Sequence, residues 1–147
     1  MYGRRELEMS VSTQSFTIET QGSADVVDIT PQVAQALEQS GFKNGIATVF
    51  ISGSTGGITT LEFEPGLRRD LPEIMDKLIP SGQRYHHDDT WHDGNGHAHL
   101  RSSLVGTSFT APFVSGKLTL GTWQQIVFLD FDNRPRRREI LVQLMGE

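Results

Sequence analysis

The sequence predicts an α+β fold, with largely antiparallel β-sheets arranged as a sandwich and two main helices packed on them. Segments of alternating apolar and polar residues, typical of half-buried strands, dominate the chain, and two other segments carry apolar residues at helical spacing. A strand, a helix, two strands, a helix, a long loop and then consecutive strands follow in order, which favours antiparallel pairing. The 147 residues are enough for one domain with a substantial core.

The composition excludes several classes of protein. The chain is 36% hydrophobic and 21% charged, and its net charge of -5 does not favour binding to nucleic acid or to an anionic membrane. No apolar run approaches the roughly 18 residues that would span a bilayer. The absence of cysteine excludes disulfides and thiolate metal sites and is compatible with a cytoplasmic location. Residues 1–10 are interpreted as a flexible leader without a secretory signal, and residues 11–147 as a single domain.

The first third of the chain is predicted to form a strand, a helix and a second strand. Residues 11–20 alternate as a strand. Thr30 and Pro31 are typical of a helix start and Gly41 of a helix end. Residues 46–52 are apolar on both faces, which predicts a strand in the centre of a sheet.

A glycine-rich segment, Gly53-Ser-Thr-Gly-Gly57, follows this strand. Its backbone N–H groups could cradle a phosphate, but it lacks the spacing of nucleotide-binding loops, so a tight turn between strands is the preferred interpretation. Residues 58–64 then alternate as a strand whose polar face carries Glu62 and Glu64. We interpret Glu64 as solvated, whereas for Glu62 a solvated role and a role as ligand or base stay equally open.

Residues 66–79 are predicted to form the second helix, since four apolar residues follow helical spacing: Leu67, Leu71, Ile74 and Leu78. A pattern resembling a capping box suggests that the regular helix begins only at Asp70. After Gly106 the chain is predicted to be mostly β, with strands at 107–114, 118–120, 121–132 and 139–145. A hairpin turn is expected at residues 115–117.

All five histidines lie within fourteen residues of one predicted long loop, 84–106: His86, His87, His92, His97 and His99. Imidazole is the commonest metal ligand of proteins and the usual acid or base near neutral pH. If this segment is extended, His97 and His99 project to the same face and can share one ion, with His86 or His87 arriving from the other arm. Three imidazoles would leave open positions on the ion, as catalysis requires.

The sequence therefore predicts a divalent metal site, with zinc as the expected ion and manganese, iron, nickel, cobalt or magnesium also compatible. Two alternatives stay open, a metal-free anion or acid/base site and a plain surface loop. His86 and His92 are interpreted as surface loop histidines. The run Arg134-Pro-Arg-Arg-Arg138 is interpreted as a solvated turn or a subunit contact, although one or two of its arginines could reach an anionic substrate.

Three motifs resemble the YjbQ-like family, whose members are known as secondary thiamine-phosphate synthases. These are Tyr85-His-His87-Asp88, then Gly94-Asn-Gly-His-Ala-His99-Leu-Arg-Ser-Ser-Leu-Val-Gly106, and Gly121-Thr-Trp-Gln-Gln-Ile126. The resemblance runs from about residue 11 to the C-terminus. It implies an α+β fold, a homotrimer, and a metal-binding pocket at or near subunit boundaries. It also implies a transferase that joins a hydroxymethylpyrimidine diphosphate to a thiazole phosphate with loss of pyrophosphate, an activity that is secondary in the family.

The resemblance also implies roles for particular residues. His87 and His99 match recurrent histidines of the family, and Glu62 matches its recurrent glutamate. Many members carry a further histidine before the threonine-rich turn, where this chain has Gly53. His97 is the candidate that would replace this missing ligand.

In the implied chemistry a divalent ion and arginines neutralise the diphosphate leaving group. Arg101, or the cluster at 136–138, would supply the arginine, and Ser102 and Ser103 would donate hydrogen bonds to phosphate oxygens. A helix beginning near Gly96 would aim its first N–H groups at the same anion.

Glu62 or Asp130 would orient a ligand histidine or take a proton. Two other functions use the same residues and stay open. One is a non-catalytic trimeric module that binds a metal or a small anion, and the other is a metal-dependent phosphoester hydrolase.

Overall fold

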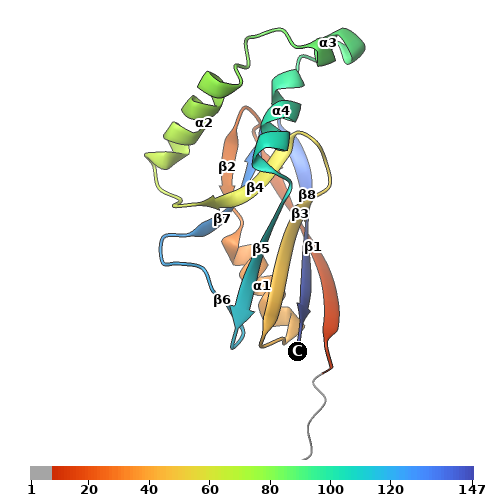
Figure 1. Cartoon of the computed structure of the whole chain (residues 1–147), viewed down its shortest axis with the longest axis vertical. Helices are drawn as coiled ribbons and strands as arrows, with labels where there is room; N and C mark the ends of the chain where they lie inside the picture. The colour runs from red at the N-terminus through yellow and green to blue at the C-terminus, as the bar shows by residue number, and fades with distance from the viewer. Residues whose placement is uncertain (1–7) are drawn as a thin grey trace, which may run out of the picture.

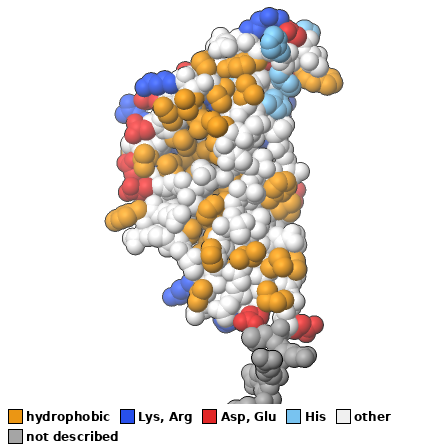
Figure 2. Space-filling view, in the orientation of Figure 1, with side chains coloured by type: hydrophobic (Ala, Val, Ile, Leu, Met, Phe, Trp, Pro, Cys, Tyr) orange, Lys and Arg blue, Asp and Glu red, His pale blue; other side chains and the backbone are white. Residues whose placement is uncertain are grey.

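Two antiparallel sheets and four helices make up the computed structural model, which describes residues 8–147 and confirms the predicted α+β class. The interpretation of residues 1–7 as part of a leader lies outside the described residues. Helices α2, α3 and α4 gather at one end of the molecule, and the C-terminus lies toward the other end (Figure 1). The histidines visible in Figure 2 lie at the end that carries α3 and α4.

The larger sheet has the strand order β1-β8-β3-β5-β6. Its strands are β1 (Ser10–Thr20), β8 (Arg136–Gly146), β3 (Gly45–Ile51), β5 (Ser108–Val114) and β6 (Lys117–Leu118). β3 pairs with β8 on one side and β5 on the other, which confirms its predicted central place. The predicted hairpin turn is also confirmed, since Ser115 and Gly116 take the positive φ angles, 52° and 75°, that such a turn needs.

The smaller sheet has the order β2-β7-β4. Its strands are β2 (Asp25–Asp28), β7 (Gln125–Asp130) and β4 (Gly56–Leu61). β2 was not predicted, because its four residues are too few to show a periodic pattern. β7 is shorter than the predicted strand 121–132, because Gln124 donates a backbone hydrogen bond to the Gly121 carbonyl and closes a turn there. Residues 52–55 connect β3 to β4, as the turn interpretation predicted.

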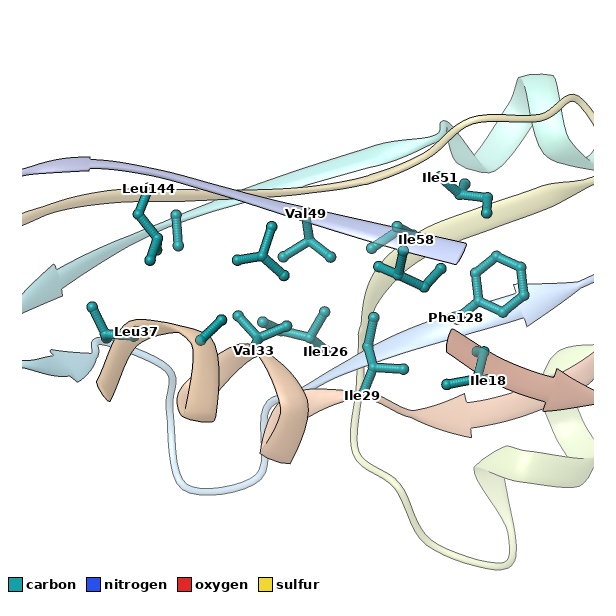
Figure 3. Packing of buried hydrophobic residues seen from close by; sticks show 14 of the residues in the cluster. Ile18, Ile29, Val33, Leu37, Val49, Ile51, Ile58, Ile126, Phe128 and Leu144 are labelled. Atoms are coloured by element: carbon teal, nitrogen blue, oxygen red, sulfur yellow. The ribbon is translucent and has the colours of Figure 1, made fainter. Parts of the chain in front are cut away.

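Helix α1 (Thr30–Ser40) packs its buried Val33 and Leu37 into the main core, where they lie near side chains of both sheets (Figure 3). This core also contains fully buried side chains from five strands, among them Val49, Ile58, Ile126 and Leu144. Gly41, at a φ of 73°, ends α1 as predicted. The start of the helix differs in detail, because the Asp28 carboxylate accepts the Thr30 N–H at 2.9 Å.

Helix α2 (Leu67–Leu78) begins before the expected Asp70. The reason is the carboxylate of Glu64, which accepts hydrogen bonds from the N–H groups of Leu67 and, at 2.8 Å, Gly66. These two bonds lower the pKa of Glu64. The interpretation of Glu64 as merely solvated is therefore wrong, since it caps the helix.

The predicted long loop at 84–106 is also wrong, because it holds α3 (His86–Trp91) and α4 (Gly96–Val105). The Asp88 carboxylate accepts the N–H groups of Tyr85 and Gly96, both at 3.2 Å, and so fixes the starts of both helices. α4 packs on β4, with Ala98 fully buried. None of the described helices is long and apolar enough to cross a membrane.

Candidate functional site

Helix α4 divides the predicted site into two. Residues two apart on a helix point about 200° away from each other, so His97 and His99 face opposite sides of α4. His97 lines a cavity of about 720 Å³ together with Arg101, whereas His99 lines a cavity of about 370 Å³ together with Ser102 and Ser103. The expectation that His97 and His99 project to one face is therefore wrong, since it assumed an extended segment.

His87 and His99 are the two histidines that the fold brings together. Their ring centroids lie 4.3 Å apart, with 52° between the ring planes. His87 Nε2 lies 3.7 Å from Asp93 Oδ1. The side chain of Asn95 is buried and lies next to both His87 and Asp93. The orientation of its amide that allows both the oxygen and the nitrogen to form hydrogen bonds has the nitrogen donating to His87 Nε2 at 3.3 Å and to Asp93 Oδ1 at 2.9 Å. No local sequence signal indicates this role of Asn95, because it depends on the turn between α3 and α4.

The pair does not amount to a complete ligand set within one chain. Among residues 8–147, no three His, Asp or Glu side chains are arranged to hold a metal ion. Gly53 lines the same cavity as His99. The resemblance to the YjbQ-like family implies a histidine at this position in many members. A divalent ion held by His87 and His99 would take its other ligands from water, substrate or another copy of the chain.

The two serines of α4 differ in what they can offer a phosphate. Ser102 is buried, and its hydroxyl donates to the Gly56 carbonyl at 2.5 Å, so its hydrogen is not available to a ligand. The structure therefore does not support the predicted hydrogen bond from Ser102 to a phosphate, because the Ser102 hydroxyl already donates to the protein. Ser103 is exposed on the same cavity as His99 and can donate.

Arg101 points away from the His87–His99 pair. Its Nε and Nη2 donate to the Ile79 carbonyl at 3.0 and 2.8 Å, and Nη2 pairs with Asp76 Oδ1 at 3.1 Å. It therefore binds α2 and does not face an anion held at His99, contrary to the expectation. Burial and the Arg101 cation lower the pKa of His97, which favours the neutral imidazole.

The predicted helix N-terminus at Gly96 is likewise taken by the protein itself. The Asp88 carboxylate already accepts the Gly96 N–H, so an aspartate stands where the substrate anion was expected. An anion at the His99 cavity instead meets Gly53, Ser54 and Ser103.

Asp130 is fully buried and contacts no histidine among the described residues. Its carboxylate accepts hydrogen bonds from Thr20 Oγ1 at 2.5 Å and from Nε and Nη2 of Arg138, both at 2.8 Å. The bond to Asp130 raises the pKa of Arg138. The expected role of Asp130 in orienting a ligand histidine is replaced by this pairing.

The arginine-rich segment is only partly the solvated turn that was predicted. Arg137 is exposed and lies 3.8 Å from Glu19. Arg136, in contrast, pairs with buried Asp132, its Nε at 2.8 Å and Nη2 at 2.6 Å from Oδ2. Arg138 is also largely buried, and a Cβ placed on Gly53 would lie 3.7 Å from its Nη1, so a cation borders the His99 cavity.

Glu62 lies far from the histidine pair within one chain. It is exposed directly after β4, whose first residue, Gly56, contacts Ser102. The strand rise places Glu62 about 20 Å further along from Gly56. Within one chain, Glu62 and Gly56, the residue that Ser102 contacts, therefore lie at opposite ends of β4.

Comparison with known proteins gives consistent matches over nearly the whole chain. A family model described as "UPF0047 protein YjbQ-like" matches residues 14–147. A UPF0047 protein of Archaeoglobus fulgidus is 40% identical over 130 residues, which cover 88% of this chain and 98% of the relative. UPF0047 protein YugU of Bacillus subtilis is 34% identical over 135 residues, covering 90% of this chain and 98% of the relative.

Solved structures match the fold as well. A YbjQ-like protein of unknown function from Sulfolobus solfataricus superimposes with a TM-score of 0.89 and 34% identity, covering 95% of this chain and 100% of that one. A YjbQ/UPF0047 family protein from Clostridium acetobutylicum gives a TM-score of 0.81 at 36% identity, covering 89% of this chain and 98% of that one.

Proposed function

Because this chain belongs to the YjbQ-like UPF0047 family, we propose that it is a metal-assisted transferase that makes thiamine phosphate. It joins a hydroxymethylpyrimidine diphosphate to a thiazole phosphate and releases pyrophosphate. The observation that carries the proposal is the His87–His99 pair, with ring centroids 4.3 Å apart, beside the cavity lined by Gly53 and Ser103.

The reaction forms one bond and breaks one. The thiazole ring nitrogen attacks the methylene carbon of the pyrimidine, and the C–O bond to the diphosphate breaks. The electron pair of that bond leaves with pyrophosphate, so negative charge grows on the leaving group. A divalent ion, with zinc expected, would supply positive charge to the diphosphate when bound.

The chain supplies the remaining contacts to the phosphates. His87 and His99 would hold the ion. Asn95 donates to His87 Nε2, so this hydrogen bond would break when the same lone pair binds the metal. Ser103 would donate a hydrogen bond to a phosphate oxygen. Arg138 borders the cavity next to Gly53 and adds positive charge, although its main partner is Asp130.

We also propose that the protein acts as a homotrimer, which would bring Glu62 of one copy toward the histidines of another. The outer face of the larger sheet supports self-association. In register across three strands, Val11, Met145 and Ile46 form an apolar row, and Phe50 lies on the same face further along β3. All four are more than one-third exposed in the single chain, and the polar row of Thr13, Gln143 and Thr48 lies between Phe50 and the other three. Self-association would bury these exposed apolar side chains.

The transferase is tested by mixing both substrates with the purified protein and zinc and measuring thiamine phosphate and pyrophosphate. We expect the wild-type protein to form both products. His87→Ala and His99→Ala should lose this activity and should also lose the bound metal, which mass spectrometry measures. His86→Ala is the matched control, because His86 is the adjacent residue and its side chain is fully exposed.

The outcomes separate the alternative functions. Unchanged metal content in both variants would sink the ligand assignment. Saturable binding of the substrates without turnover would indicate a non-catalytic module. Phosphate release from simple esters, without thiamine phosphate, would indicate a hydrolase.

The trimer is tested by light scattering on Phe50→Glu. A buried carboxylate at a subunit contact is costly, so we expect this variant to shift the mass toward that of a 16.4 kDa chain. Leu78→Glu is the control, since Leu78 is an exposed apolar residue on α2, away from the sheet. A trimer that survives Phe50→Glu but not Leu78→Glu would place the contact on the helices.

A further inference from the structure

A wide cavity lies between α2 and α4, on the side of α4 opposite His99. Its volume of about 720 Å³ is within the range of about 300–1,000 Å³ typical of small-molecule sites. Its walls come from both helices, from the segment before β2 and from the turn after β7. None of its lining residues lines the cavity that contains His99.

His97 and Arg101 are the buried polar groups of this cavity. They are only 5% and 3% exposed. Within residues 8–147 neither ring nitrogen of His97 has a hydrogen-bond partner, and Arg101 uses Nε and Nη2 for the protein but leaves Nη1 without one. Both groups turn unused nitrogens toward the cavity, where water reaches them, so a ligand with acceptor atoms can take the place of that water.

The carboxylate that pairs with Arg101 is shared with other donors. The buried Arg101 cation pairs with one carboxylate, that of Asp76, whose side chain is 60% exposed. Asp76 also accepts hydrogen bonds from the backbone N–H and hydroxyl of Ser81 at 3.0 Å. Its carboxylate is therefore shared and reached by water, and an anion in the cavity would complete the partners of Arg101.

The rim of the cavity carries cationic, anionic and neutral polar side chains. Lys77 adds a cation and Glu73 an anion from α2, and Ser23 and Asn133 add a hydroxyl and an amide from across the cavity. Pro72 and Ala24 supply an apolar wall. The cavity therefore combines nitrogen donors at its base with space and apolar surface for an organic group.

We propose that this cavity is a second ligand site, which binds the phosphate group of a small molecule through His97, Arg101 and Lys77. A tetrahedral oxyanion can accept hydrogen bonds from these three side chains at once, each from a different direction. Inorganic phosphate and a phosphomonoester share this chemistry, and the space beside Pro72 favours the ester. The inference does not depend on the proposed transferase, because the His99 cavity is on the other face of α4.

The test is a titration of the full-length protein with inorganic phosphate and, separately, glycerol phosphate, followed by two-dimensional NMR at constant ionic strength. We expect saturable shifts of the backbone amides of Ala24, Gly94 and Asn133. Binding of either compound there supports the site, and tighter binding of glycerol phosphate identifies an ester as the ligand class. No saturable shift with either compound would overturn it.

Variants assign the contacts. His97→Leu should weaken binding at these amides roughly tenfold or more, as expected for a lost hydrogen bond to a charged group. Lys77→Gln should weaken it less, because Lys77 is on the exposed rim. Ser103→Ala is the matched control on the opposite face of α4 and should leave it unchanged. Unaltered affinity in His97→Leu would contradict the proposal.

A second measurement uses the wild-type protein alone. Tungstate, a heavy analogue of phosphate, is soaked into crystals, and its anomalous signal is located. We expect a peak between His97 and Arg101. A peak only beside Ser103, or no peak at all, would overturn the second site while leaving the transferase proposal standing.

Discussion

Two polar regions of this protein use their charged side chains in opposite ways. Where the two sheets meet, Asp130 at the end of β7 binds Thr20 at the end of β1 and Arg138 in β8. Around α3 and α4, in contrast, His87 lies against His99, and His97 has no hydrogen-bond partner among the described residues. The first region is satisfied by its own chain and joins the sheets. The second is held in place by packing yet keeps nitrogen atoms free, which is what a ligand site requires.

Breaking the buried Asp130–Arg138 pair where the two sheets meet should have the largest effect on the free energy of unfolding. Arg138→Met leaves the Asp130 carboxylate buried without its cation, so we expect a loss of about 3–5 kcal/mol in the free energy of unfolding. Urea unfolding followed by circular dichroism measures it. Arg137→Met is the control, because this exposed pair with Glu19 should contribute no more than about 1 kcal/mol. Equal losses in the two variants would show that the junction is not held by the buried pair.

The stability of the region around α3 and α4 should depend on a bound ligand more than on the loss of a single side chain. Zinc at about 100 times its dissociation constant should stabilise the wild-type protein by about 2.7 kcal/mol. His99→Ala removes one ligand and should abolish this gain while changing the stability of the metal-free protein little, since His99 is only half-buried. Thermal unfolding with and without zinc measures both. A gain of the same size in His99→Ala would mean that zinc binds elsewhere.

Adjacent serines of α4 provide a smaller and sharper comparison. Ser102→Ala leaves the buried Gly56 carbonyl without its partner and should cost about 1–3 kcal/mol. Ser103→Ala, at the exposed next position, should stay within about 0.5 kcal/mol. Chemical unfolding of both variants tests this. Similar values would mean that the Ser102 hydrogen bond contributes nothing measurable.

Acid should lower the free energy of unfolding by a still smaller amount, through protonation of Asp132, which pairs with Arg136. Burial raises the pKa of Asp132, but the Asn133 N–H and the Arg136 guanidinium outweigh it and hold the pKa below its usual value. The unfolded state therefore takes up a proton first as the pH falls. The stability from Asp132 is fully present above the unfolded pKa of about 3.9 and is lost as the pH falls through the folded value.

Stability measured between pH 5 and pH 2, at about half-unit steps, checks this window. Asp132→Asn cannot titrate, so the slope of its unfolding free energy against pH should be shallower there than that of the wild type. A steeper or unchanged slope would contradict the depressed pKa.

Much of the fold could be predicted because its signals are local. The alternation of apolar and polar residues predicted β1. The two apolar faces of β3 predicted its central place in the sheet, and Gly41 predicted the end of α1. The same approach failed for α3, and for α4 it predicted a loop, although the expected chemistry had included a helix beginning near Gly96, where α4 does begin. Gly94, Asn95 and Gly96 are typical of a loop, and the first turn of α4 is fixed by Asp88, eight residues away.

The candidate site was predicted in part for the same reason. That the histidines gather in one segment is a property of the sequence, and two of them, His87 and His99, do meet. The partners of Arg101, Arg138 and Asp130 could not be foreseen. Each lies in a different element, and their contacts depend on how the sheets and helices pack.

The sequence by itself determined the fold class, the family and the segment that holds the histidines, since periodicity, motifs and composition are properties of the chain alone. Only the tertiary structure decided which side chains share a site. A helix turns by about 100° per residue, so forming α4 sent His97 and His99 to opposite cavities. Packing on β4 helps hold α4 in place, and a contact of this kind between distant segments has no local signature.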